Sequence, residues 1–135
     1  MVGHILNIAT DDFGTVIIMG FLDKAINNTK ASIDSGSSKF NEKVEVEKLE
    51  SKVRDKKREI DDLCKEIGHE TYELAIDKDN AHQQKIEENI KKIKEAKEAI
   101  EGYEKEIEEI KAKGKEEREN IKAEAQAKNE EADKQ

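Results

Sequence analysis

The chain has 135 residues, of which 43% are charged, 34% are hydrophobic and 4% are aromatic, and it contains no proline. A charged fraction this far above the usual quarter is typical of disordered polyelectrolytes and of long helices with a thin apolar core, and it argues against a large globular core. The net charge of −8 is spread along the chain with both signs interleaved, so the sequence lacks the basic cluster that nucleic-acid binding requires.

Residues 1–18 are predicted to be a poorly ordered extension. The apolar run at 15–22 is far shorter than the roughly 20 residues that span a bilayer. The residues before it lack the basic region and the cleavage site of a secretory signal. A single strand here would also have no partner strand to stabilise it.

Residues 19–38 are predicted to form an amphipathic segment followed by a linker. Apolar residues follow a helical period over 20–33, with Asn and Lys on the opposite side, which predicts a short amphipathic helix. Its candidate surface-docking edge consists of Phe21, Leu22 and Ile26. The sequence Asp-Ser-Gly-Ser-Ser at 34–38 then predicts a flexible joint and the start of the next helix.

From Lys39 onward the sequence is typical of a coiled coil, because apolar residues recur every seven positions. We expect two helices, over about 39–76 and 81–113, that form an antiparallel hairpin across 39–113. The predicted interaction seam, which runs along one face of both helices, consists of Val46, Val53, Ile60, Ile67, Leu74, Ile86, Ile93, Ile100 and Ile107. The residues predicted to widen this seam are Leu49, Leu63, Ile90, Ala96, Tyr103 and Ile110.

The turn between the helices is predicted at 77–84. Its turn and N-cap residues are Asp77, Asp79 and Asn80. Asn80 together with Gln83 fits a capping box. A turn at this point favours a hairpin over one long rod, since the heptad phases of the two helices then agree.

Folding the chain back at position 80 predicts which residues lie opposite each other. The numbers of opposite residues then sum to 160, so that Ile60 meets Ile100. Lys56 would face Glu104 across the seam, in a polar layer that fixes the register.

Two glycines and the C-terminal sequence complete the pattern. Gly68, inside the first helix, either allows a close approach of the partner helix or of a second chain, or is a tolerated flaw. Beyond Ile110 the apolar repeat fades, and Gly114 weakens the helix. Residues 114–135 are therefore predicted to be a charged helical or disordered tail with nothing to bury.

The residues that carry chemistry are few. A single cysteine, Cys64, cannot form an internal disulfide, which favours a reducing compartment. It lies beside Leu63 at the edge of the seam and is interpreted as a small buried packing residue, with an interchain disulfide or a reactive thiol as alternatives. His4, His69 and His82 lack the spacing of metal ligands. With no phosphate-binding loop or nucleophile elbow, the sequence predicts no catalytic residue, no cofactor and no metal, and hence no enzyme.

Short motifs give the chain a resemblance to a known group. Residues 19–24 read Met-Gly-Phe-Leu-Asp-Lys, and the first helix contains Glu-Ile-Gly at 66–68 and Tyr-Glu-Leu at 72–74. Over about 19–113 the chain thereby resembles small bacterial coiled-coil proteins that open with M-G-F-x-D-K. The resemblance implies a helical hairpin, a bacterial cytoplasm and a natural start at Met19. Some members end in a zinc ribbon of paired CxxC motifs, which this sequence lacks, so no zinc role is carried over.

A weaker resemblance is to proteins of the phage-shock-protein A type, which pair a short amphipathic segment with a long helical hairpin. That resemblance implies binding at the inner face of the bacterial membrane. The polar face of 20–33 offers only Lys24 and Lys30 against Asp23, so attraction to anionic lipid is expected to be weak.

The sequence therefore predicts an all-α, non-enzymatic coiled-coil interaction or scaffold protein in the cytoplasm. It would self-associate, as a homodimer, or dock a partner helix, because pairing two hairpins into a four-helix bundle buries more apolar surface than one hairpin does. The alternative is a peripheral membrane-surface protein that uses 20–33. Nucleic acid is not an expected partner.

Overall fold

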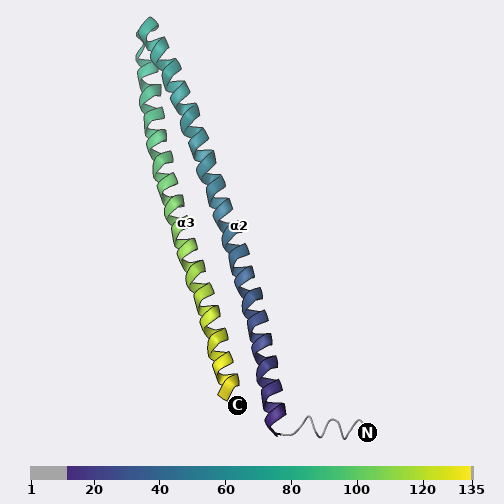
Figure 1. The fold of residues 1–135 in the computed structure, drawn as a ribbon. Helices are drawn as coiled ribbons and strands as arrows, with labels where there is room; N and C mark the ends of the chain where they lie inside the picture. Colours follow the sequence, from purple (N-terminus) through teal and green to yellow (C-terminus); the bar gives the residue numbers. More distant parts are fainter. Residues whose placement is uncertain (1–11, 135) are drawn as a thin grey trace. The chain divides into compact units, whose positions relative to one another are not determined.

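The chain is described here by a computed structural model, which places residues 12–134 and the side chains from residue 18 onward. Within this range it folds as helix α2, Asp12–Asp77, and helix α3, Asn80–Lys134 (Figure 1). The all-α class and the helical hairpin were predicted from the sequence, and both are confirmed.

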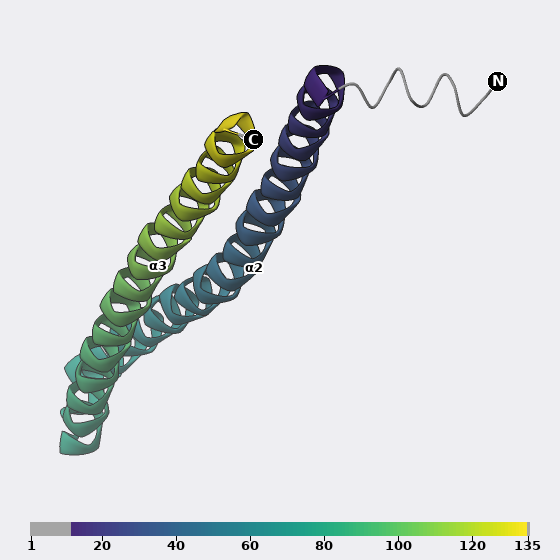
Figure 2. The same ribbon diagram turned by 90° about the horizontal axis from the view of Figure 1, so that it is seen from below.

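The contacts divide the chain into two compact units, which are described separately. The turn unit, Lys43–Ala112, contains the end of α2, the turn and the start of α3. The terminal unit consists of the described parts of Met1–Glu42 and Lys113–Gln135. In each unit a segment of α2 lies beside a segment of α3 that runs in the opposite direction (Figures 1 and 2).

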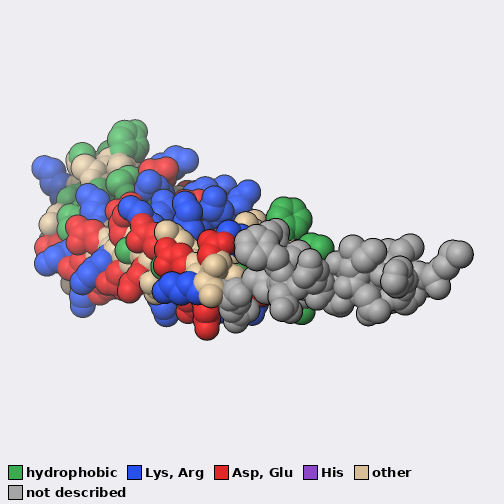
Figure 3. Space-filling view, turned by 60° about the horizontal axis from the view of Figure 1, so that its bottom comes forward, with side chains coloured by type: hydrophobic (Ala, Val, Ile, Leu, Met, Phe, Trp, Pro, Cys, Tyr) green, Lys and Arg blue, Asp and Glu red, His purple; other side chains and the backbone are tan. Residues whose placement is uncertain are grey.

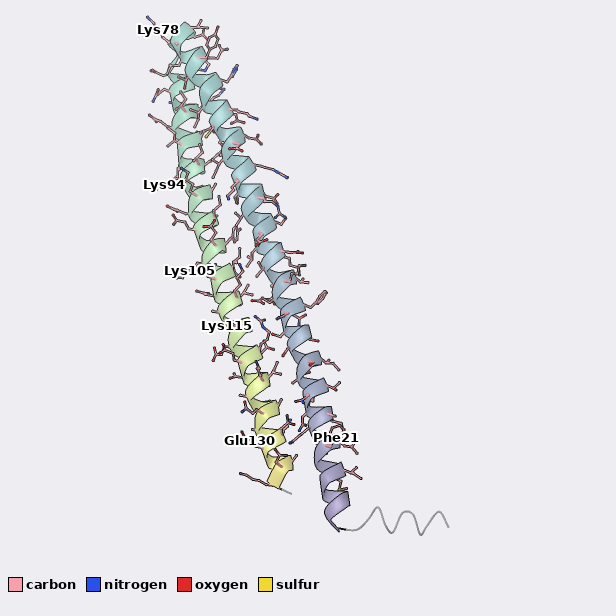
Figure 4. All side chains as sticks on the ribbon, viewed as in Figure 1. Phe21, Lys78, Lys94, Lys105, Lys115 and Glu130 are labelled. Carbon is pink, nitrogen blue, oxygen red and sulfur yellow. The ribbon has the colours of Figure 1, made fainter. Side chains whose placement is uncertain are left out.

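The turn is built from Lys78 and Asp79. Lys78, labelled at the turn in Figure 4, has a positive φ of 55°, and its N–H donates to the Leu74 carbonyl at 2.9 Å. This left-handed residue ends α2. Asp79 then caps α3, because its Oδ1 accepts from the Ala81 N–H at 3.0 Å. The predicted capping box was wrong: Asp79 is the cap, and the Gln83 amide donates to Glu87 at 3.3 Å instead.

The turn unit has a thin apolar core between its two helices. A cluster of Val46, Leu49 and Ile107 is buried there, with Tyr103 and Ile110 packed against it. These positions recur at the spacing of a and d residues in a coiled coil, so each helix contributes one narrow apolar face. Further buried apolar residues in this unit are Val53, Leu63 and Ala96.

The predicted register of the two helices was wrong by about one helical turn. Folding at position 80 would place Glu66 opposite Lys94, but the Glu66 carboxylate accepts from the Asn89 amide at 3.2 Å. The reason lies in the turn, since a chain that folds back two residues earlier shifts every opposite position by about four. Lys56 consequently does not pair with Glu104, and its Nζ bonds Glu59 on its own helix at 3.0 Å.

The predicted joint at 34–38 is absent, and so is a separate amphipathic helix, because α2 continues through both. Glycine and serine weaken a helix that stands alone. Here the helix is supported by packing in the terminal unit, where Ser38 is buried and Ser35 half-buried. A groove next to these serines is lined by residues of both helices, including Ala31 of α2 and Ala125 of α3.

The ends of the chain also differ from the prediction. Residues 12–18 were expected to be poorly ordered, but they belong to α2, and residues 1–11 lie outside the described part. The C-terminal segment is helical to Lys134 and does have something to pack on. Its Ala132 is 8% exposed, and Asp133 forms an ion pair with Lys24 of α2.

Two glycines have different surroundings. A Cβ at Gly68 would meet nothing within 4 Å, so the contact between α2 and α3 does not require glycine there. A Cβ at Gly114 would lie 3.2 Å from the side chain of Glu42 and 3.1 Å from that of Arg118. Gly114 therefore leaves room for an ion pair, in addition to weakening the helix as the sequence suggested.

Candidate functional site

The predicted interaction seam lies between α2 and α3 of the turn unit. Val46, Val53 and Ile107 are buried, with 7%, 8% and 7% of their surface exposed. The half-buried members are Ile60, Ile67, Leu74, Ile86, Ile93 and Ile100. These side chains are wholly or partly buried in the contact between the two helices, so a partner would bind mainly to other surfaces of the chain.

Two residues near the seam are placed differently from the prediction. Cys64 is exposed and is not a buried packing residue, because Leu63 occupies the inward position and the next residue turns about 100° around the helix. Ile90 is 54% exposed, whereas Asn89 is buried. The amide of Asn89 is satisfied by Glu66 across the interface, a pairing that the apolar repeat gave no reason to expect.

The turn holds a cluster of titratable groups that the sequence analysis did not bring together. His82 Nδ1 lies 2.5 Å from Glu70 Oε2, and His82 Nε2 lies 3.4 Å from Asp77 Oδ2. Lys85 Nζ approaches the other Glu70 oxygen at 3.6 Å. The side chains of His82 and Glu70 are only 18% and 15% exposed. Glu70 closes the inside of the turn by joining the two helices.

This contact shifts the pKa of both partners. The hydrogen bond to Glu70 raises the pKa of His82 above its ordinary value of about 6.5, and the weaker bond to Asp77 acts in the same direction. The same hydrogen bond, helped by Lys85, lowers the pKa of Glu70 below its ordinary value of about 4.5.

These shifts predict a pH dependence of stability. Protonated His82 stabilises the fold fully below its unfolded pKa of about 6.5, and this contribution is lost as the pH rises through the higher folded pKa. The Glu70 carboxylate contributes above about pH 4.5 and loses its contribution as the pH falls through the lower folded pKa. We expect the thermal midpoint to fall as the pH rises above about 6.5 and through the raised pKa of His82 in the folded chain, and to fall less in the His82→Gln variant.

The control for this measurement is His69→Gln. His69 Nε2 lies 3.9 Å from Glu73, and its side chain is 71% exposed, so its removal should leave the fall in midpoint intact. An equal fall in the parent chain and in His82→Gln would refute the role of the turn contact.

Glu73, Asp77 and His82 also offer three ligand atoms that lie within 4.8 Å of one another. Both His82 ring nitrogens already contact carboxylates, so a cation would have to compete with a proton for them. The arrangement is better explained as a closure of the turn than as a metal site.

Apart from Ile121, the interface of the terminal unit is made of small and polar residues. Those that are buried or half-buried on the α2 side are Lys24, Asn27, Ala31, Ser35, Ser38 and Glu42, and those on the α3 side are Gly114, Arg118, Ile121, Ala125, Asn129 and Ala132. The Asn27 amide donates to Asn129 at 3.2 Å, and Arg118 Nη1 donates to Glu42 at 2.9 Å. From residue 18 onward, where the side chains are described, the large apolar side chains of this α2 segment are more than half exposed.

Those residues form an exposed apolar face on α2. The face is defined by Met19, Leu22, Ile26, Ile33 and Phe40, whose exposed fractions are 60%, 52%, 64%, 63% and 67%. In Figure 3, a few green hydrophobic side chains lie next to the grey residues, on a surface that is otherwise largely blue, red and tan. Part of the face is a shallow groove lined by Leu22, Ile26 and Ile33. Phe21 lies beside it and is 71% exposed, so the predicted docking edge of Phe21, Leu22 and Ile26 is accessible.

Comparison with known proteins yields no similar family model, no similar curated protein and no similar solved structure. Neither of the two helices, over the residues that the structure describes, has an apolar stretch long enough to cross a membrane.

Proposed function

We propose that the chain is a non-enzymatic coiled-coil interaction protein, which self-associates as a homodimer or docks a partner helix through the exposed apolar face of α2. The observation that supports this function is that the α2 segment of the terminal unit has two different faces. Its large apolar side chains are exposed, whereas small and polar side chains make the contact with α3. Contiguous exposed apolar patches on soluble proteins often mark interaction sites, which supports this proposal.

The alternative function is binding to a membrane surface through 20–33. The exposure of Phe21, Leu22 and Ile26 favours it, since these side chains would be the inserted edge. The charges around them favour it less, because Lys24 is engaged by Asp133, and the positive charge of Lys30 is offset by the negative charge of Asp23 within the same segment. Interfacial helices depend on several basic residues on the polar face.

Analytical ultracentrifugation over a series of protein concentrations tests the proposal. We expect the parent chain to form dimers and Ile33→Asp to weaken them, because a charge would then have to be buried in the new interface. The matched control is Ile90→Asp, which introduces the same charge at a position 54% exposed in the turn unit and should leave association unchanged.

Vesicle flotation separates the two functions. Phe21 lies outside the exposed apolar face, so Phe21→Asp should leave dimers intact, and anionic vesicles should not retain the chain. A parent chain that stays monomeric, together with flotation that Phe21→Asp abolishes, would replace the interaction function by the membrane one.

A further inference from the structure

The exposed apolar face of α2 has the spacing of a second coiled-coil seam. Met19, Ile26, Ile33 and Phe40 follow one another at intervals of seven residues. A second row at sevens, Leu22, Thr29 and Gly36, lies three residues after each of the first three. Positions alternating by three and four along a helix are the a and d positions of a heptad repeat. The partner that this spacing favours is therefore a second helix, packed along the face, and not a flat surface.

The polar member of the second row can enter an interface at little cost. Thr29 Oγ1 donates to the Ala25 carbonyl at 2.8 Å, one turn earlier on the same helix. Its hydroxyl is thus already hydrogen bonded, and its methyl group is free to pack. Gly36 presents no side chain and leaves room for a large one, since a Cβ there would meet nothing within 4 Å.

We propose that the exposed apolar face pairs with the same face of a second copy of this chain, with the two α2 helices antiparallel. This inference rests on the proposed self-association and names the face and the direction that produce it. A two-fold axis near residues 27 and 28 would place Met19 opposite Gly36, Leu22 opposite Ile33, and Ile26 opposite Thr29 of the second copy. Each of these pairs consists of one residue of the first row and one of the second, just as a positions pack against d positions in antiparallel coiled coils.

The flanking charges select this direction. Asp23 and Lys30 directly follow residues of the second row, so both occupy the e position of the heptad. In an antiparallel pair the e positions of one helix face the e positions of the other, so Asp23 lies opposite Lys30 of the second copy. The two-fold axis repeats the contact, because a symmetric interface pairs each residue twice. The dimer gains two attractive charge pairs on one side of the seam.

A parallel, in-register pair of the same helices lacks these advantages. Parallel coiled coils bring the residue before the first row close to a residue five positions later on the partner. Lys30 would then face Ala25, and Asp23 would face Ile18, so neither charge would find a partner. Gly36 would also lie against Gly36 and Phe40 against Phe40, which leaves one layer empty and another crowded.

The flanking charges give a sharp test in the full-length chain. Asp23→Lys and Lys30→Asp each turn two attractive pairs into two repulsive ones, and each should weaken dimerisation about tenfold. The double variant carrying both changes restores attraction and should return the dissociation constant to near the parent value. Both side chains are exposed, so circular dichroism should show the same helix content in every variant. A double variant as weak as the singles would overturn the antiparallel pairing.

Cysteine cross-linking reports the direction itself. In a Cys64→Ser background, Leu22→Cys and Ile33→Cys chains should form a disulfide with each other when mixed and oxidised, and neither should form one alone. In the antiparallel pair two copies of position 22 are about 11 helical positions apart, or roughly 16 Å along the axis. Equally rapid cross-linking of each single variant by itself would indicate parallel helices and overturn the inference.

The outcomes separate this inference from the proposed function. If dimers form, but the cysteine variants do not cross-link and the charge variants keep the parent dissociation constant, the named face is wrong while self-association stands. A parent chain that sediments as a monomer at every concentration would overturn both.

Discussion

Replacing Leu49 by alanine should lower the free energy of unfolding by about 2–3 kcal/mol. Leu49 is 6% exposed and belongs to the cluster with Val46 and Ile107. The turn unit holds only a narrow apolar core between two helices, so no neighbouring layer of side chains can fill the space that the smaller residue leaves. The loss therefore includes the transfer of the removed methyl groups and the cost of the cavity.

Urea unfolding followed by tyrosine fluorescence measures this change in the right part of the chain. Both tyrosines, Tyr72 and Tyr103, lie in the turn unit. The matched control is Ile90→Ala, which removes a large apolar side chain that is already 54% exposed and should cost less than about 1 kcal/mol. Equal losses in the two variants would mean that the described packing does not hold the turn unit together.

Replacing Arg118 by leucine should destabilise the terminal unit by about 1–2 kcal/mol. The Arg118 guanidinium donates to the Glu42 carboxylate at 2.9 Å, and the two side chains are only 19% and 17% exposed. Removal of the arginine leaves a carboxylate that is largely shielded from water and has lost its charged partner. Gly114 borders this pair closely, so little room remains for water to replace it.

A double-mutant cycle isolates the contribution of the pair. Glu42→Leu combined with Arg118→Leu removes both charges and should recover much of the stability that either single change loses. The comparison is a second cycle on Lys24 and Asp133, whose side chains are 38% and 60% exposed and whose coupling should stay below about 1 kcal/mol. The coupling free energies are measured by circular dichroism in urea. Similar values in both cycles would show that burial does not strengthen the interaction between Glu42 and Arg118.

The apolar repeat in the sequence was sufficient to predict the helices and the faces that they bury in the turn unit. Val46 and Val53 of α2 lie seven positions apart, as do Ile100 and Ile107 of α3, and a helix brings each pair to one of its faces. The same repeat could not determine the register. The predicted alignment sets Ile60 against Ile100, and a shift of about four positions sets it against Ala96, so both alignments bury apolar side chains. The local geometry at Lys78 and Asp79 decided between them.

The terminal unit was harder to predict, because its interface contains few large apolar residues. Asp-Ser-Gly-Ser-Ser at 34–38 is typical of a linker when judged alone, and the alanines after Gly114 had no visible partner. Each segment is helical because the other supplies small side chains and hydrogen-bonding groups, as Asn27 and Asn129 do. A contact between residues about 100 positions apart is invisible to any local pattern.

The sequence by itself therefore determined the class of this protein: charged helices that form a hairpin, a turn between them, and an amphipathic segment over 20–33. Only the tertiary structure decided which apolar residues stay exposed. The α3 segment meets α2 through Ala31, Ser35 and Ser38, which leaves Ile26 and Ile33 in solvent. The physical reason is that the sequence of a helix can contain two faces suited to contact. Which of them is buried depends on the helix that packs against it in the folded chain.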